Sequence, residues 1–365
     1  MVEFLFVGTY ILYFIFIVWV MIYWRYNEVI VSNLPFLSIV VVVRNEESNI
    51  MNLLTDFSKL DYPSEQIEFI IVDDNSTDFT LKLIRENSLN NLSFIRLGEY
   101  NGSPKKNAIT KAVSVAQGDY ILCTDGDCRI KPFWASKMAA FINHKYDYVC
   151  APVIYSPVKG LFQRLQAIEM LSLVGITAGM INVGYPAMSN AANMIFKKNS
   201  FKKIAGYQGL ESVISGDDEL LMHKFKKQGC KVAYLSTIDV IVKTKPNVTL
   251  SELTKQRRRW GSKWKYYQLP YVKVVALFIF FLYLLTIFSF SLVLKGVFPV
   301  KIFLNGLMLK FVLEYFFVKL IKKDLLRESL SMLWFLLTFL VYPIYVVFIG
   351  ILSNFKGFEW KGRKY

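Results

Sequence analysis

Residues 118–128 read Gly-Asp-Tyr-Ile-Leu-Cys-Thr-Asp-Gly-Asp-Cys, and this stretch indicates the fold of the chain. Its apolar part, residues 120–123, is long enough for a short buried strand, and two carboxylates, Asp125 and Asp127, follow closely. Ligands of open α/β sheets bind beyond the carboxyl ends of the strands, and Gly126 lets the backbone approach such a ligand. Carboxylate oxygens suit hard divalent cations, so the pattern is compatible with a Mg²⁺ or Mn²⁺ site and also with a surface turn.

Apolar strands alternate with helical segments before this stretch. Residues 37–43 are an almost continuous β-branched run, which is typical of a parallel strand buried on both faces. Two further strands are predicted at residues 68–72 and 93–97, and Asn45 is expected to cap a helix that ends near residue 60. The alternation predicts an α/β fold with a mostly parallel sheet covered on both faces.

Two polar clusters follow the predicted strands. Asp73 and Asp74 end the second strand, where carboxylates can accept hydrogen bonds from the ribose or base of a nucleotide. A polar strand-to-helix turn explains this pair equally well. Lys105 lies in the first turn of a helix that Ser103 is expected to cap, where backbone N–H groups and an ammonium can hold a phosphate. Lys106, in the same turn, is expected to be solvated.

The composition indicates a membrane protein, since 54% of the 365 residues are hydrophobic and 16% are aromatic. Residues 4–24 carry no charge, are long enough to cross a bilayer and lack a small-residue cleavage site, which predicts a retained anchor. Residues 274–294 and 332–352 are predicted as two more crossings. Residues 297–318 carry three charged side chains, so they span, lie at the interface or re-enter the membrane.

The charge distribution points to a membrane surface. The formal net charge is +15, and much of the excess lies in residues 255–265, 319–327 and 356–364, beside the apolar runs. Basic segments in such places normally face the cytoplasm and anionic lipid headgroups. Membrane lipids are therefore the predicted partners, and no nucleic acid is expected.

Cysteine and histidine show no pattern of a disulfide or a metal site. The four cysteines form no C-x-x-C pair and have no histidine at zinc-ligand spacing, so free thiols in a reducing cytosol are expected. The chain has only two histidines, neither in a motif, which leaves carboxylates to carry any catalysis.

Four motifs occur in an order that resembles a known family. They are residues 41–47, residues 72–78, the Asp-Gly-Asp of residues 125–127, and residues 193–198. In this order they resemble the inverting family-2 glycosyltransferases of GT-A fold, and the likeness covers about residues 37–260. The predicted domains are an N-terminal transmembrane anchor (1–25), a GT-A catalytic domain (36–245), an interfacial region (246–270), a C-terminal transmembrane region (271–352) and a basic tail (353–365).

The resemblance also implies roles for single residues. It makes Asp218 the catalytic base, although the family usually has Glu-Asp where this chain has Asp217 and Asp218, followed by Glu219. It implies a divalent metal, Mg²⁺ or Mn²⁺, at Asp125 and Asp127. The nucleotide-sugar site that it implies contains Asp73, Asp74, Lys105, Asp125, Gln256, Arg259 and Trp260.

The last three of these residues form the Q-x-x-R-W motif of membrane-associated members, which include processive polysaccharide synthases. An arginine can pair with a diphosphate in bidentate fashion, and an indole offers a face to a sugar or a lipid. The spacing of Gln256, Arg259 and Trp260 puts them on one face of a helix. Arg257 and Arg258 are expected to point elsewhere, toward lipid headgroups.

Residues 159–181 form a long, largely apolar segment. It is either a core helix or a membrane-contacting helix that lines an acceptor channel. Gly175, Gly179 and Gly184 are expected to break its later part.

The resemblance implies an integral protein of the inner or plasma membrane with a cytoplasmic catalytic domain. Its reaction would move a sugar from a nucleotide sugar, in the first place a UDP-sugar, to a hydroxyl of a lipid or polyprenyl-linked acceptor. Processive polysaccharide synthesis is the alternative that the Q-x-x-R-W motif favours, and a sensor or scaffold without turnover is a third. Two C-terminal crossings would keep the basic tail in the cytosol, and we expect this topology because residues 360–363 resemble the tail of related membrane transferases.

Overall fold

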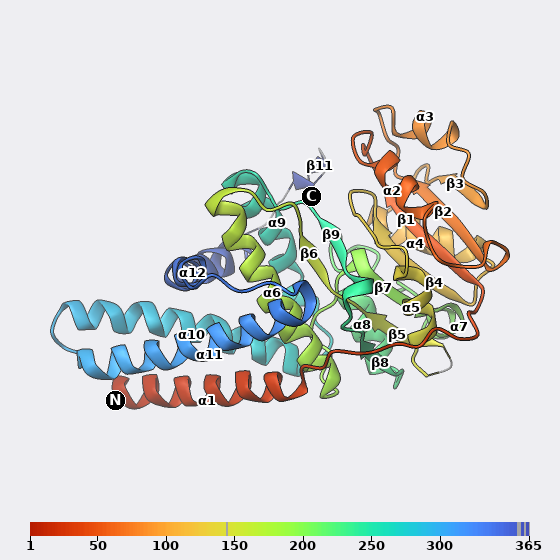
Figure 1. The fold of residues 1–365 in the computed structure, drawn as a ribbon. Coiled ribbons are helices and arrows are strands. Elements are labelled where there is room, and N and C mark those ends of the chain that lie inside the picture. The colour runs from red at the N-terminus through yellow and green to blue at the C-terminus, as the bar shows by residue number, and fades with distance from the viewer. Residues whose placement is uncertain (144, 356–358, 361–362, 365) are drawn as a thin grey trace. The chain divides into compact units, whose positions relative to one another are not determined.

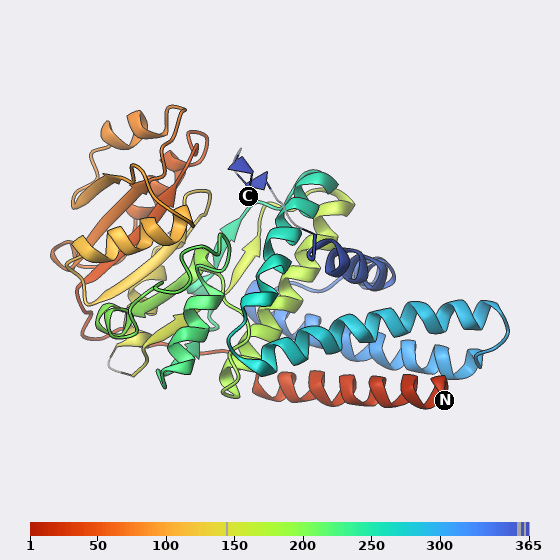
Figure 2. The ribbon, with the colours of Figure 1, turned by 180° about the vertical axis from the view of Figure 1, so that it is seen from behind.

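The structure is a computed structural model that describes residues 1–143, 145–355, 359–360 and 363–364. The chain forms two compact units, shown as ribbons in Figures 1 and 2. The helical unit comprises residues 1–25, 158–185 and 246–358, and the α/β unit comprises residues 26–157, 186–245 and 359–365.

A seven-stranded sheet organises the α/β unit, with the order β3-β2-β1-β4-β7-β5-β8. The strands β3, β2, β1 and β4 are parallel, and β7 runs antiparallel to its neighbours β4 and β5. These strands are β1 (Leu37–Val43), β2 (Ile67–Asp73), β3 (Leu92–Arg96), β4 (Tyr120–Asp125), β5 (Tyr148–Cys150), β7 (Met194–Lys197) and β8 (Val232–Tyr234). Two short pairs complete the strands, β6 (Val153–Tyr155) with β9 (Val242–Thr244) and β10 (Glu359–Trp360) with β11 (Arg363–Lys364).

Helices cover both faces of this sheet, as predicted. Ile39 and Val41 of β1 belong to one core with Leu53 and Trp134, while Val40 is buried on the opposite face, where α4 contacts β1 and β2. The helices of the unit are α2 (Ile50–Phe57), α3 (Thr80–Arg85), α4 (Pro104–Val115), α5 (Trp134–Ile142), α7 (Lys198–Lys203) and α8 (Glu219–Lys227), with the 3-10 turns Ser64–Gln66, Ala191–Asn193 and Ile238–Val240.

The predicted cap at Asn45 is wrong, whereas Ser103 is the N-cap residue of α4 as predicted but makes no capping hydrogen bond with its side chain. The first helix begins only at Ile50, and Asn45 has a left-handed φ of 52°, a conformation that asparagine tolerates better than most residues. Its side-chain oxygen accepts a hydrogen bond from the Thr77 N–H at 2.8 Å, which ties the loop after β1 to the loop after β2. Ser103 does precede α4, but its hydroxyl donates to the Ile214 carbonyl at 3.1 Å.

Long apolar helices make up the helical unit, in which α1 packs against α6 and α11, and α12 packs against α10 and α6. The helices α1, α10 and α11 lie side by side (Figures 1 and 2). The helices are α1 (Val2–Tyr23), α6 (Gly160–Asn182), α9 (Leu250–Ser262), α10 (Pro270–Leu294), α11 (Val300–Leu326) and α12 (Met332–Leu352), with the 3-10 turn Lys263–Tyr266 after α9.

The glycines of α6 do not break it, contrary to the sequence prediction. The helix continues through Gly175 and Gly179 to Asn182. A Cβ at Gly179 would lie 2.6 Å from the Val20 side chain, and one at Gly175 would lie 2.0 Å from the Ile321 side chain. These glycines therefore let α1 and α11 approach α6 closely, which is a common role of small residues between membrane helices.

Among the described residues, four helices are long and apolar enough to cross a membrane: α1, α6, α10 and α12. The set includes the three segments predicted from sequence and adds α6. The helix α11 is outside the set because its apolar run carries charges, and Lys310 pairs there with Glu314 at 2.8 Å. Lys310 is only 3% exposed, so this pair is held inside the bundle.

Candidate active site

Acidic side chains gather at the carboxyl edge of three neighbouring strands. In the parallel register, Asp73 of β2 lies opposite Val43, and Asp125 of β4 lies opposite Val42, so both carboxylates flank the end of β1. The chain leaves β1 toward β2 on one side, while β4 is added on the other, which makes this edge a topological switch point. Open α/β sheets bind their ligands at such points.

Asp73 and Asp74 are both almost fully buried, and they have different partners. The carboxylate of Asp73 accepts hydrogen bonds from the Ser76 N–H at 3.2 Å to each oxygen, so it shapes the turn after β2. The carboxylate of Asp74 accepts hydrogen bonds from Nη1 of Arg363 at 2.8 and 3.1 Å. Arg363 also donates to the Tyr100 hydroxyl and lies over the Tyr100 ring.

Arg363 belongs to the basic tail, and sequence reasoning did not place it near the acidic edge. Its pairing with Asp74 brings this part of the tail onto the α/β unit. Arg363 is thus part of the surroundings of the acidic edge.

Lys105 connects two acidic segments that are far apart in the sequence. Its ammonium lies 2.6 Å from Oδ1 of Asp125 and 3.2 Å from Oδ2 of Asp217, and its side chain is mostly buried. Burial alone would lower the pKa of Lys105, but the two carboxylates outweigh that effect and raise the pKa above its ordinary value. Lys105 is therefore a permanent cation between the end of β4 and the turn before α8.

Two residues beside this cluster were missed or misjudged from sequence. Asp217 was read only as the neighbour of Asp218, yet it is buried against Lys105. Lys106, expected to be solvated, is 1% exposed, and its ammonium donates to the carbonyls of Leu210 at 2.9 Å and Val213 at 2.6 Å. Lys106 thus anchors the segment that leads to Asp217.

Asp218 starts helix α8 as its N-cap. Its Oδ1 accepts the Glu219 N–H at 2.6 Å, and its Oδ2 accepts the Ala191 N–H at 3.1 Å. A capping carboxylate satisfies N–H groups that the helix itself leaves unpaired, and its charge complements the helix dipole. Asp217 and Glu219 are buried, whereas Asp218 is only half-buried, so it is the most accessible of the three acids.

Asp125 and Asp127 are half-buried on either side of Gly126. The Thr244 hydroxyl donates to Oδ2 of Asp127 at 3.3 Å. A Cβ at Gly126 would lie 3.0 Å from a Val43 methyl group and 3.1 Å from the Glu46 side chain, so a larger residue would push these neighbours aside. The glycine therefore keeps the turn between the two carboxylates tight.

No three His, Cys, Asp or Glu side chains cluster as a metal site anywhere in the described ranges. Two carboxylates nevertheless fit a Mg²⁺-type ion, which commonly takes one or two protein carboxylates and completes its shell with substrate phosphates and water. Asp125 and Asp127 supply this donor set. The oxygen-only chemistry of the turn is thus suited to a metal shared with a phosphorylated ligand.

Buried thiols beside the acidic edge take no part in proton chemistry. Cys123, Cys128 and Cys150 are free and buried, as expected for cysteines without a disulfide. Burial raises the pKa of Cys150 to about 12 and raises the pKa values of Cys123 and Cys128 as well. All three therefore remain neutral near neutral pH.

The Q-x-x-R-W residues lie on α9 of the helical unit, which starts with a Thr249–Glu252 capping box. Oε1 of Gln256 accepts hydrogen bonds from Asn247 Nδ2 at 3.0 Å and from Arg257 Nη1 at 2.6 Å. Arg259 and Trp260 are half-buried. The prediction that Arg257 faces lipid headgroups is wrong, because its side chain is 4% exposed and pairs with a carboxylate at 2.6 Å.

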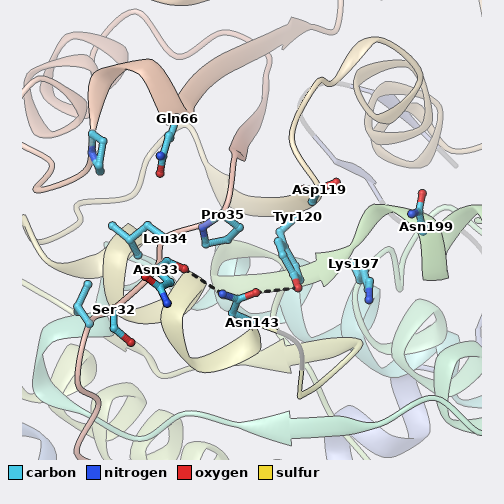
Figure 3. A pocket seen from close by; sticks show the side chains of 12 residues that line it. Ser32, Asn33, Leu34, Pro35, Gln66, Asp119, Tyr120, Asn143, Lys197 and Asn199 are labelled. Atoms are coloured by element: carbon cyan, nitrogen blue, oxygen red, sulfur yellow. Dashed lines mark hydrogen bonds between the residues drawn. The ribbon is translucent and has the colours of Figure 1, made fainter.

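A hollow in the α/β unit lies at the opposite edge of the sheet, with a volume of about 790 Å³ (Figure 3). Asn143 lies at its centre, donating to the Asn33 carbonyl at 3.0 Å and accepting from the Tyr120 hydroxyl at 3.3 Å. Its other lining residues are Val31, Ser32, Leu34, Pro35, Pro63, Gln66, Asp119, Lys197 and Asn199. None of the predicted site residues lines it, so it is separate from the acidic edge.

The sheet order and the acidic switch point define a GT-A-like α/β fold with a mostly parallel central sheet. Residues 38–204 match the family model described as Glycosyl transferase family 2. The match supports a family-2 glycosyltransferase.

Two curated relatives are also glycosyltransferases by their names. The beta-monoglucosyldiacylglycerol synthase of Nostoc sp. (strain PCC 7120 / SAG 25.82 / UTEX 2576) is 34% identical over 108 residues, which are 29% of this chain and 23% of that protein. The poly-beta-1,6-N-acetyl-D-glucosamine synthase of Staphylococcus aureus is 27% identical over 245 residues, which are 64% of this chain and 56% of that protein. The chain thus spans less than two thirds of the length of these relatives.

A solved structure shares the fold over nearly the whole chain. It is the mannosyltransferase PcManGT from Pyrobaculum calidifontis in complex with GDP-Man and Mn²⁺, with a TM-score of 0.58 and 15% sequence identity. The similarity covers 96% of this chain and 95% of that one. At this identity the comparison shows the fold alone.

Proposed function

We propose that this chain is a membrane-bound inverting glycosyltransferase that moves a sugar from a UDP-sugar to a hydroxyl of a lipid or polyprenyl-linked acceptor. One observation carries the proposal: Lys105 joins Asp125 of the D-x-D turn to Asp217, the neighbour of Asp218, at the carboxyl edge of the sheet. This brings a cation, a candidate metal turn and a candidate base into one site. The family match over residues 38–204 and the apolar helices agree with it.

The donor would bind along the ends of β2, β1 and β4. Asp74 follows β2, where its carboxylate would exchange part of its pairing with Arg363 for hydrogen bonds from the nucleoside, and Asp73 holds the turn that presents it. Lys105 would exchange part of its pairing with Asp125 for the donor diphosphate, because its ammonium carries three donors on a flexible stem. In the other unit, Gln256, Arg259 and Trp260 would contact the diphosphate and the acceptor.

A divalent cation, Mg²⁺ or Mn²⁺, would be held by Asp125 and Asp127 together with the donor phosphates. When bound, it neutralises charge that grows on the nucleoside diphosphate as the sugar–phosphate bond breaks. The complex of PcManGT with GDP-Man and Mn²⁺ supports this cofactor class. Thr244 orients Asp127 through its hydroxyl.

Asp218 would act as the catalytic base. Its carboxylate takes the proton of the acceptor hydroxyl, whose oxygen attacks the anomeric carbon on the face opposite the leaving nucleoside diphosphate, so the configuration inverts. The accessibility of Asp218 supports this role, since Asp217 and Glu219 are buried. Its two backbone hydrogen bonds hold the carboxylate in a fixed orientation.

The relatives favour two acceptor classes. The glucosyldiacylglycerol synthase name supports transfer to a lipid, and we place a single transfer to a lipid at the cytoplasmic membrane face first. The poly-N-acetylglucosamine synthase name favours a processive polysaccharide synthase as the second candidate, because that relative matches a larger share of the chain. Both use the same donor site and differ in what occupies the acceptor site.

The test is a donor screen on isolated membranes that contain the protein, using radiolabelled UDP- and GDP-sugars. We expect label from a UDP-sugar in the lipid extract, with an inverted anomeric configuration in the product. Label that stays in an insoluble polymer supports the second candidate. No transfer from any donor, with the protein folded in the membrane, would contradict the proposed function.

A further inference from the structure

Arg257 is a buried cation inside the Q-x-x-R-W motif, at one of its variable positions. Its Nη2 lies 2.6 Å from Oε2 of Glu169 on α6, and its Nε donates to the Tyr345 hydroxyl of α12 at 2.9 Å. Tyr345 donates in turn to Oε1 of Glu169 at 3.1 Å. Three helices of the helical unit thus fix the plane of one guanidinium.

Other contacts of Arg257 reach two residues of the motif itself. Its Nη1 donates to Oε1 of Gln256 at 2.6 Å, and its guanidinium carbon lies 4.2 Å from the centre of the Trp260 ring. The same Oε1 of Gln256 also accepts from Asn247 Nδ2 at 3.0 Å, and Asn247 bonds in turn to Gln166 of α6. The amide and the indole are therefore oriented by the same buried cation.

We propose that Arg257 is a positioning residue, which sets the side chains of Gln256 and Trp260 for contact with the donor diphosphate or the acceptor. The inference rests on the proposed function, in which those two side chains meet the substrates. A planar guanidinium has five N–H donors in a rigid fork, so fixing one edge against Glu169 also fixes its other edge and its face. Lysine offers one point charge and cannot serve all these partners at once.

A buried ion pair can also do no more than hold helices together, and kinetics separate the two roles. If Arg257 only stabilises the helical bundle, its variants reduce the amount of folded enzyme and leave the KM of the enzyme that does fold unchanged. If it positions Gln256 and Trp260, its variants raise the same KM that the Trp260→Ala variant raises. The effects of Arg257 and Trp260 substitutions are then not additive.

The experiment compares Arg257→Lys, Trp260→Ala and the double variant in purified full-length protein, with kinetics normalised to folded enzyme. Lys255→Gln is the matched control, because it removes a positive charge from an exposed position of the same helix. Trp260→Ala identifies which KM depends on the motif, that for the donor or that for the acceptor. We expect Arg257→Lys to raise this same KM roughly tenfold or more, and the KM of the double variant to be no higher than that of Trp260→Ala. Lys255→Gln should stay within about twofold of the wild type.

Tyr345→Phe keeps the Arg257–Glu169 pair and removes one partner of the guanidinium, so it serves if Arg257→Lys does not fold. It should raise the same KM by a smaller factor. A KM within about twofold of wild type in the Arg257 or Tyr345 variants, or fully additive effects with Trp260→Ala, would overturn the inference and leave the proposed function intact. Absence of transfer by the wild-type protein would overturn both.

Discussion

Lys105 in the α/β unit and Arg257 in the helical unit are both buried cations, but the balance of charge around them differs. Lys105 lies between Asp125 and Asp217, so its cluster carries more negative than positive charge. Arg257 pairs with the carboxylate of Glu169, and this pair is balanced. An acidic excess can take up a metal ion and exchange partners with a phosphate, whereas a balanced buried pair holds structure in place.

Asp218 gives the sharpest test of the acidic cluster. Asp218→Asn keeps an oxygen acceptor for the helix cap, so the protein should fold, but the amide cannot take a proton. We expect sugar transfer to fall about 10³-fold, within the range typical of general-base removal. Initial rates with saturating donor and acceptor measure the loss.

Glu219→Gln is the control for this assignment, since Glu219 is buried at the next position. It should retain most of the activity. Full activity in Asp218→Asn together with loss in Glu219→Gln would move the base to Glu219.

The next largest loss of activity is expected from substitutions in the turn that contains Asp125 and Asp127. Asp127→Ala removes one of two carboxylates that would hold the cation, and we expect sugar transfer to fall roughly 10²-fold. In the wild type, a chelator should abolish transfer, and added Mg²⁺ or Mn²⁺ should restore it. Isothermal titration of the cation in the presence of UDP provides a readout besides activity. Asp119→Asn, at the opposite end of β4, should change neither the rate of sugar transfer nor the binding of the cation. Activity that resists the chelator would contradict the metal site.

Lys105→Met tests whether the cation between the acids serves the donor. Loss of a charged hydrogen bond to the diphosphate should raise the donor KM by about 10- to 100-fold, measured against Lys111→Met, an exposed position on the same helix. The pKa of Lys105 in the folded protein is raised above its ordinary value of 10.5. The ion pairs of Lys105 are therefore fully formed below pH 10.5 and weaken only as the pH rises through the raised pKa of the folded protein. Donor KM should therefore show no Lys105-dependent change between about pH 6 and 9. An unchanged donor KM in the Met variant would make Lys105 a structural residue that does not contact the donor.

The carboxylates of the acidic edge were largely predicted from sequence, whereas the burial of Arg257 and Lys106 was not. Strands such as residues 37–43 show themselves locally because each is an apolar run of strand length, and the acids that follow must meet at one edge of a parallel sheet. The partners of Arg257 and Lys106 lie 88 and 104 residues away, and no local pattern records such pairings. Arg257 was therefore assigned to lipid headgroups, Lys106 to solvent, and the helix that contains Gly175 and Gly179 was assigned breaks, because contacts with distant residues decide all three.

The balanced pair should differ from the acidic cluster in stability more than in chemistry. Glu169→Gln leaves the Arg257 charge buried without its carboxylate, which should cost about 3–5 kcal/mol of unfolding free energy, seen as a lower Tm in detergent. Glu328→Gln is the matched control in the same unit, because Glu328 is exposed and its pair with Lys322 at 3.2 Å should contribute about 0–1 kcal/mol.

Asp217→Asn in the α/β unit should lower the Tm less than Glu169→Gln, because Lys105 keeps Asp125 as a partner. Equal losses of Tm in Glu169→Gln and Asp217→Asn would show that the two cations are held alike, and the contrast between a balanced pair and an acidic excess would not stand.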